Sequence, residues 1–245
     1  MGKFFTVEVK PEIAASKQKL GAFTDGDLMF DWTSFQVPSG ASRLLGVCAV
    51  VRAGDGATAD HALNLHFAKT IDYNAPESLG TIHATANGKR YYNNLIGTCL
   101  IEETDMYVDG ALDHVAVGFS GGGNRFLGPG IVLQGEKDSG GYSGYDTLYV
   151  AGTTPDGDTN FASTVQIQSQ TATNSSTVAV KTTSAENCFT KGDVLYDEDD
   201  QLLGTVSIVS SPTNIVLTSN CASVSAINKD VYNLNPIKLI LSFER

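Results

Sequence analysis

The sequence has few basic residues, and they form no run. Of its 245 residues, 16 are Lys or Arg and 27 are Asp or Glu, which gives a formal net charge of −11. Binding to a nucleic-acid backbone depends on clustered cations. We therefore expect no nucleic-acid partner.

The sequence also lacks a long apolar run. No stretch approaches the roughly 20 apolar residues that a helix needs to cross a bilayer, and residues 1–5 lack the apolar segment of a secretory signal. Gly2 and Thr6 match a myristoylation pattern, but that pattern is too short to indicate a lipid anchor. We expect no membrane partner.

Cysteine and histidine are scarce, with four of each. Cys48 and Cys99 lie in apolar, strand-like segments, whereas Cys188 and Cys221 lie in polar turns. Because none has the spacing of metal ligands, we expect buried thiols without a disulfide.

Metal-binding patterns are equally weak. His61 and His66 are five residues apart, which places them on opposite faces of a strand. The acidic segment from Asp197 to Asp200 offers carboxylate oxygens for calcium but lacks the spacing of a helix-loop-helix site, and a solvated hairpin turn explains it without an ion. We predict no metal and no cofactor.

No catalytic constellation stands out. Residues 118–122 read Gly-Phe-Ser-Gly-Gly, which fits the pattern around a hydrolase nucleophile at Ser120. That pattern needs a helix next, but residues 123–130 are rich in Gly and Pro. All four histidines also precede Ser120. The carboxylates from Glu102 to Asp109 form no specific pair, so we expect a protein that is not an enzyme.

Alternation of apolar and polar residues dominates the sequence instead. In residues 236–245, Ile237, Leu239, Leu241 and Phe243 share one face, and near the other terminus Phe5, Val7 and Val9 alternate in the same way. A period of two is typical of half-buried strands. We expect these two terminal strands to pair in one sheet, because each needs a partner for its apolar face.

Further strand-like segments follow one another between turn signals. The most apolar, residues 42–53, is predicted to be a central strand buried on both faces. Short strands at regular spacing predict an all-β fold whose main part is a jelly-roll-like β-sandwich. The other expected strands of this part span residues 28–35, 63–69, 95–102, 114–119, 131–134 and 147–151.

The composition shifts near residues 153–158. From there to about residue 235 the chain has no Trp or His and is rich in Ser, Thr and Val. We predict a main domain of residues 1–158 together with 236–245, and a small inserted β-barrel or roll of residues 159–235. Its expected strands span residues 164–168, 177–180, 194–196, 202–209, 214–218 and 230–233.

Residues 70–94 form the longest irregular segment, and such loops often carry function or an interface. Local folding over the end of the sandwich is the alternative. Exposed tyrosines here and at Tyr142 and Tyr145 also fit stacking on sugars. The candidate interface residues are the aromatic and aliphatic side chains that interface cores favour, together with one proline: Ile71, Tyr73, Pro76, Leu79, Tyr91 and Tyr92.

Three stretches resemble virion structural proteins of tailed phages, particularly the short β-rich proteins of marine and cyanobacterial phages. They are residues 30–38 (FDWTSFQVP), residues 65–69 with 74–80 (LHFAK, NAPESLG), and residues 191–196 with 203–206 and the ending 242–245 (KGDVLY, LGTV, SFER). None is a catalytic signature.

The resemblance implies a structural part of a capsid or tail, above all a capsid decoration protein. Its partners would be the major capsid protein or other virion proteins, and it would form a homo-oligomer in a particle assembled in the host cytoplasm, where thiols stay reduced. A tail-associated receptor- or glycan-binding module is the alternative.

Overall fold

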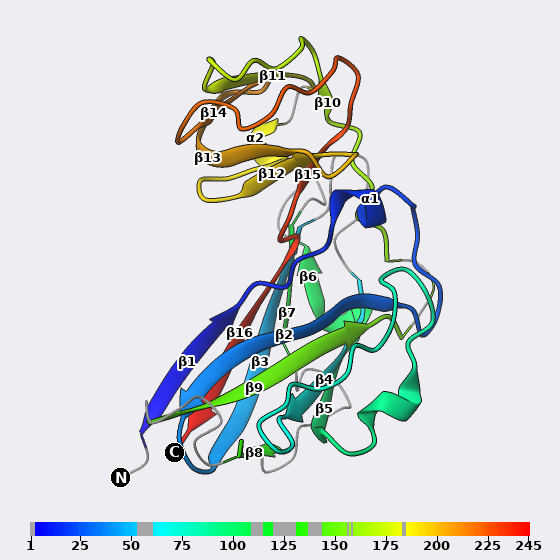
Figure 1. The fold of residues 1–245 in the computed structure, drawn as a ribbon, viewed down its shortest axis with the longest axis vertical. Helices are drawn as coiled ribbons and strands as arrows, with labels where there is room; N and C mark the ends of the chain where they lie inside the picture. Colours follow the sequence, from blue (N-terminus) through cyan, green and yellow to red (C-terminus); the bar gives the residue numbers. More distant parts are fainter. Residues whose placement is uncertain are drawn as a thin grey trace.

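A computed structural model describes residues 3–52, 61–108, 115–119, 131–136, 144–155, 157, 159–182 and 185–245. The fold is nearly all β, with 50% of residues in strands and 7% in helices, and its sheets are antiparallel. The predicted all-β class is therefore confirmed. The molecule is elongated, with two sheets in its larger part and a third at the opposite end (Figure 1).

The first sheet contains both terminal strands. Its order is β1 (Phe4–Val9), β16 (Ile237–Glu244), β3 (Ser42–Arg52), β7 (Val115–Phe119) and β6 (Met106–Val108), and β8 (Ile131–Leu133) also pairs with β3. Phe5 lies opposite Phe243 and Val7 opposite Leu241. The predicted pairing of the termini is confirmed, and Figure 1 shows the two chain ends side by side.

The second sheet consists of β2 (Leu28–Pro38), β9 (Tyr145–Thr153), β4 (Leu63–Lys69) and β5 (Leu95–Ile101). Its apolar side chains and those of the first sheet belong to one core cluster. The ring of Phe243 lies 5.1 Å from that of Phe5 and 6.4 Å from that of Phe35, so aromatic contacts join the two sheets.

Strand β3 differs from its prediction. It is central in the first sheet, but its burial alternates: Val47, Ala49 and Val51 are buried, whereas Arg43 and Leu45 are exposed. An antiparallel sheet commonly packs on the core with one face and meets water with the other. The expectation that β3 is buried on both faces is therefore wrong.

The third sheet is built from residues 166–233. Its order is β10 (Gln166–Ile167), β11 (Thr177–Lys181), β14 (Asn214–Leu217), β13 (Leu202–Ser211), β12 (Val194–Asp197) and β15 (Val231–Asn233). It has a core cluster of its own, to which the short helix α2 (Ala185–Cys188) contributes Ala185 and Cys188. The division of the chain into two domains stays a prediction.

The segment after β1 connects the two ends of the molecule. It contains one short helix, α1 (Ala15–Gln18). The buried Gln18 amide donates to the carbonyl oxygens of Ile13 (2.7 Å) and Asn233 (2.8 Å). The Ser16 amide donates to a carboxylate oxygen of Asp200 (2.9 Å). These bonds attach the N-terminal segment to the third sheet.

Candidate interaction sites

The loop of residues 70–94 is folded against the second sheet. Leu79 is fully buried, and its amide donates to an Asp31 carboxylate oxygen at 3.0 Å. The Trp32 indole donates to the Glu77 carbonyl oxygen at 2.9 Å. Pro76 is buried as well. As direct interface contacts, Pro76 and Leu79 are wrong, because their side chains pack inside the chain.

Tyr91, in the 3-10 helix η1 (Gly88–Tyr91), is half-buried and holds the end of this loop on the sheet. Its ring meets Trp32 edge-on at 6.1 Å and lies 4.5 Å from the ring of His66. Burial, with a smaller contribution from the Asp31 charge, raises the pKa of Tyr91 to about 12. Burial lowers the pKa of His66 to about 4, so this imidazole is neutral near pH 7.

Glu136 fixes the tip of the loop. Its carboxylate accepts hydrogen bonds from the amides of Tyr73 and Asp72 (both 2.8 Å) and from the Thr70 hydroxyl (2.7 Å). These bonds, that of Tyr73 foremost, hold the pKa of Glu136 below its usual value. Ile71 is half-buried in this turn, whereas the Tyr73 side chain is 67% exposed.

Tyr92 is the most exposed of the six predicted interface residues, at 90%. Beside it in sequence lies a polar hollow of about 390 Å³, lined by Glu77, Asn87, Lys89, Arg90, Asn93 and Asn94. Local folding, the alternative for this loop, therefore accounts for Pro76, Leu79 and Tyr91. Tyr73 and Tyr92 remain available to a partner.

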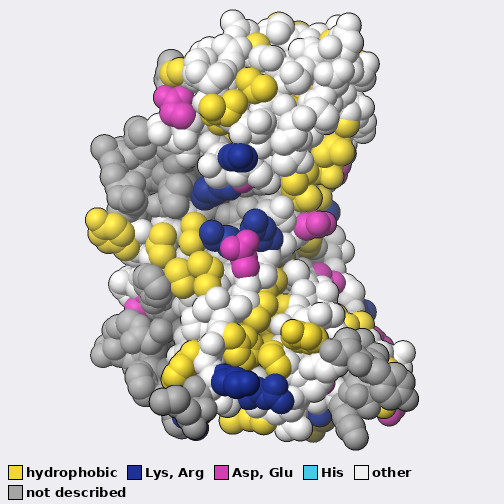
Figure 2. All heavy atoms as spheres, turned by 90° about the vertical axis from the view of Figure 1, so that its left-hand side faces the viewer, with side chains coloured by type: hydrophobic (Ala, Val, Ile, Leu, Met, Phe, Trp, Pro, Cys, Tyr) yellow, Lys and Arg dark blue, Asp and Glu magenta, His cyan; other side chains and the backbone are white. Residues whose placement is uncertain are grey.

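The solvent-facing side of the first sheet, here called the outer face, carries apolar side chains that the sequence pattern did not single out. Four of them are between 41% and 71% exposed: Phe4, Leu45, Tyr107 and Val132. Residues that lie opposite one another on adjacent strands form rows across the sheet. One row contains Phe4, Glu244, Arg43 and Val132. Another row contains Val50, Val117 and Tyr107. Hydrophobic side chains gather over the larger part of the molecule in Figure 2.

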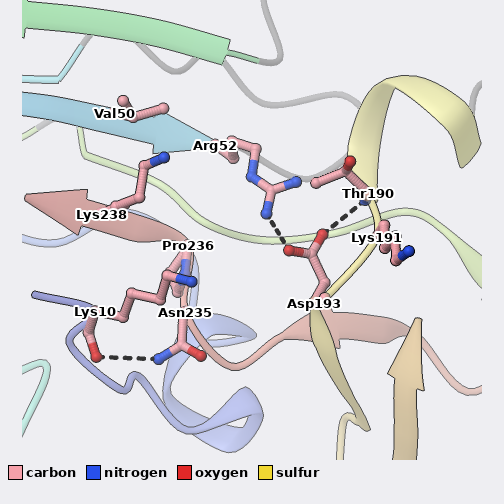
Figure 3. Close-up of a pocket in the computed structure, with 10 residues that line it drawn as sticks. Lys10, Val50, Arg52, Thr190, Lys191, Asp193, Asn235, Pro236 and Lys238 are labelled. Carbon is pink, nitrogen blue, oxygen red and sulfur yellow. Dashed lines mark hydrogen bonds and ion pairs between the residues drawn. The ribbon is translucent and has the colours of Figure 1, made fainter. Parts of the chain in front are cut away.

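A cleft of about 290 Å³ lies where the first sheet meets the third, and we call it the waist cleft (Figure 3). Four of the residues that line it are cations: Lys10, Arg52, Lys191 and Lys238. Lys and Arg side chains gather at the narrow middle of the molecule in Figure 2. The other lining residues are Val50, Thr190, Gly192, Asp193, Asn235 and Pro236.

One ion pair crosses the waist cleft. The guanidinium of Arg52 contacts the buried carboxylate of Asp193, which also accepts from the Thr190 amide at 2.8 Å. The Asn235 amide group donates to the backbone oxygens of Lys10 (3.2 Å) and Pro11 (3.0 Å). These contacts fix the walls of the cleft.

The acidic turn between β12 and β13 is a hairpin turn, as predicted, and hydrogen bonds and ion pairs hold its carboxylates. The buried Asp197 carboxylate accepts from the amides of Asp199 and Gln201 (both 3.0 Å) and from the Ser225 hydroxyl (2.6 Å). The Lys229 ammonium contacts Asp199 and Glu198, and these bonds raise the pKa of Lys229. Within the described ranges, no three His, Cys, Asp or Glu side chains are grouped as metal ligands.

The four cysteines all lie in described residues, and none forms a disulfide. Cys99, Cys188 and Cys221 are buried as predicted, whereas Cys48 is only half-buried. Burial raises the pKa of the Cys48 thiol, an effect that nearby Lys238 partly offsets.

Several residues considered in the sequence analysis lie outside the described residues: Gly2, Asp109, Ser120, Tyr142 and the glycine-rich loop 120–130.

No protein-family model matches the chain, and no curated protein sequence matches it significantly. Among the described residues, no helix has the length and hydropathy to cross a membrane. What the candidate sites can do is therefore argued from their geometry.

Sequence reasoning missed the waist cleft, although one signal for it was present. Once the terminal strands pair with Val9 opposite Leu239, continuing the register by one residue sets Lys10 opposite Lys238. Two lysines at facing positions are unfavourable without a counter-charge. Arg52 and Asp193 could not be added to the cluster from the sequence, because their meeting depends on how the third sheet docks.

Proposed function

We propose that the protein is a non-enzymatic structural component of a virus particle, a capsid decoration protein that binds the shell through its outer face. The observation that carries this proposal is the set of exposed apolar side chains Phe4, Leu45, Tyr107 and Val132 on that face. The solvated face of an antiparallel sheet is usually polar. Contiguous exposed apolar surface marks interaction sites.

The architecture supports the same proposal. We propose that the first two sheets form a jelly-roll-like β-sandwich of residues 1–158 and 236–245. Residues 159–235 form an inserted β-barrel or roll. Two separate core clusters favour this division. A decoration protein needs a rigid scaffold of this kind, and its partners would be the major capsid protein or other virion proteins.

The size of the outer face favours repeated copies. Five strands about 4.8 Å apart, each presenting roughly six residues of about 3.4 Å, span about 500 Å². A stable interface buries about 800 Å² on each partner. One copy would bind weakly through this face, whereas a homo-oligomer on a repeating lattice gains affinity from simultaneous contacts.

The test replaces Leu45 and Val132 by Asp and measures the copy number on purified particles by quantitative mass spectrometry. We expect hundreds of copies of the unaltered chain and a loss of most of them in the variant. Leu20→Asp is the matched control, because Leu20 is similarly exposed (56%) but lies beside α1. Full occupancy by the double variant, with both proteins equally folded, would contradict the proposal.

A tail-associated receptor- or glycan-binding module is the second candidate, favoured by the exposed ring of Tyr92 next to the polar hollow. An aromatic face with neighbouring amides such as those of Asn87 and Asn93 suits a sugar ring. A handful of copies at the tail tip would support this function and reject decoration. Tyr92→Ala should then abolish binding to host glycans while Tyr73→Ala should not.

A further inference from the structure

The waist cleft concentrates positive charge in a chain whose net charge is −11. Lys238 lies opposite Val50 in the first sheet, and Lys10, the residue after β1, lines the same cleft as Lys238. The Arg52 amide bonds to the Pro236 carbonyl oxygen at 2.8 Å, two residues along from that pair. Alternation places Val50 and Arg52 on the same face as Lys238, so three cations share one corner of the outer face.

The carboxylates of the chain only partly balance this cluster. Asp193 pairs with Arg52, and Glu8 pairs with Lys10 at 3.1 Å. No ion pair within the described residues involves Lys238 or Lys191. Among the described residues, Lys10 and Arg52 each pair with one carboxylate, and Lys238 and Lys191 pair with none.

The directions of the side chains show which of the four cations can bind a ligand together. In Figure 3, the ammonium groups of Lys10 and Lys238 and the guanidinium of Arg52 surround one space in front of Pro236. Lys191 lies beyond Asp193 with its ammonium turned away from Arg52. Lys10, Arg52 and Lys238 thus form the part of the cleft that can hold an anionic group.

We propose that the waist cleft receives the Asp or Glu side chains of an acidic segment in the partner polypeptide. This inference rests on the proposed function, because it specifies the chemistry of the partner that covers the outer face. The two surfaces are continuous: Lys238, Val50, Val117 and Tyr107 form one row across the sheet. A chain lying along the apolar row therefore reaches the cations at its end.

The cleft itself favours a carboxylate. The Arg52 guanidinium already pairs with the Asp193 carboxylate, so it can bind a carboxylate at the wall of the cleft. Lysine ammonium groups are flexible point charges that suit carboxylates arriving on a mobile segment. A volume of about 290 Å³ admits one or two acidic side chains, not a folded domain.

The experiment uses the full chain and two capped peptides, one with Glu at alternate positions and one with Gln at the same positions. Binding is followed by fluorescence anisotropy in about 0.1 M salt, where the Debye length is about 10 Å. We expect only the Glu peptide to bind, with its shift confined to the amides of Val50, Gly192 and Lys238 in NMR spectra. Lys238→Gln should weaken binding by roughly fivefold, and adding Lys10→Gln by roughly as much again.

Lys89→Gln is the matched control, because it makes the same charge change in an exposed loop away from the cleft. It should leave the affinity within about twofold of the unaltered chain, as expected for a charge farther away than the Debye length of about 10 Å at 0.1 M salt. Equal weakening by Lys89→Gln and Lys238→Gln would refute the site and indicate a general charge effect.

Two further outcomes would overturn the proposal. One is binding of the Gln peptide as tightly as the Glu peptide. The other is displacement of the Glu peptide by inorganic phosphate where sodium chloride of equal ionic strength has no effect, which would assign the cleft to a phosphate-bearing ligand. Because these measurements need no particles, they fail or succeed independently of the decoration test.

Discussion

Replacing Leu239 by Asp tests the pairing on which the first sheet depends. Leu239 is fully buried in β16, between Val9 of β1 and Ala49 of β3. Its neighbour Ile240 points to the outer face and is half-buried. Ile240→Asp is therefore the matched control: it places the same carboxylate one residue away on the opposite side of the strand.

The expected cost is worked out from two contributions. Loss of the leucine side chain from a packed core costs about 2–5 kcal/mol. A buried carboxyl avoids its charge by a pKa rise of about 3–5 units, and with an unfolded-state pKa of about 3.9 this adds about 4 kcal/mol at neutral pH. The sum is comparable to the free energy of unfolding of a typical domain, which is about 5–15 kcal/mol. Ile240→Asp should cost about 1–2 kcal/mol, because its side chain can reach water.

The sign of the pH dependence follows from the raised pKa. In the folded Leu239→Asp variant the carboxyl is neutral, whereas in the unfolded chain it ionises near pH 3.9. The carboxyl penalty is absent below that pH, grows as the pH rises, and levels off above the folded-state pKa. The difference in stability from the unaltered chain should therefore shrink in acid, while the loss of leucine packing remains.

Urea unfolding followed by tryptophan fluorescence measures this effect, since the one tryptophan, Trp32, lies in β2 of the second sheet. NMR amide signals of residues 166–233 report separately on the third sheet. If that sheet is an independent domain, its signals stay dispersed when Trp32 reports unfolding. Equal midpoints for Leu239→Asp and Ile240→Asp would refute the reasoning about the register.

Three shorter predictions concern single features. His66, with a pKa of about 4 in the folded chain and about 6.5 unfolded, should not titrate in NMR spectra between pH 8 and 5. Stability should fall as the pH drops from about 6.5 toward 4, and ionisation near pH 6.5 in the folded protein would contradict this. Gly152→Ala should cost about 1–3 kcal/mol in thermal unfolding, because its Cβ would lie 2.3 Å from the Phe30 ring. Gly88→Ala, with a nearest contact of 3.8 Å, is its control, and equal losses would contradict the packing argument. The turn from Asp197 to Asp200 should bind no calcium, so a melting temperature that falls on adding a chelator would show this prediction to be wrong.

Strand positions could be predicted because alternation is a local signal. The faces of β1 and β16 follow directly from residues two apart. The same signal failed for β3, where Leu45 and Val50 are apolar yet lie on the outer face. An apolar residue indicates a preference for burial, but only the arrangement of the sheets decides which face is covered.

The candidate interface could be predicted only in part, because loop packing depends on distant contacts. Leu79 is buried by a turn that Asp31 holds from 48 residues away, and no pattern within residues 70–94 indicates that bond. Tyr73 and Tyr92 have exposed rings, and their role in an interface stays a prediction. An aromatic residue in a loop therefore indicates a contact, but it does not indicate whether the contact is within the chain or with another molecule.

The outer face and the waist cleft contribute differently to binding, because one is apolar and the other is positively charged. In the acidic turn, Lys229 pairs with Asp199 and Glu198, and backbone amides bind the Asp197 carboxylate. The cations of the waist cleft lie at one end of an apolar row. Apolar contact stabilises a complex without fixing its direction, whereas paired charges fix the register and exclude wrong partners. If the outer face binds a shell, the cations at the end of that face determine the orientation of each copy on the shell.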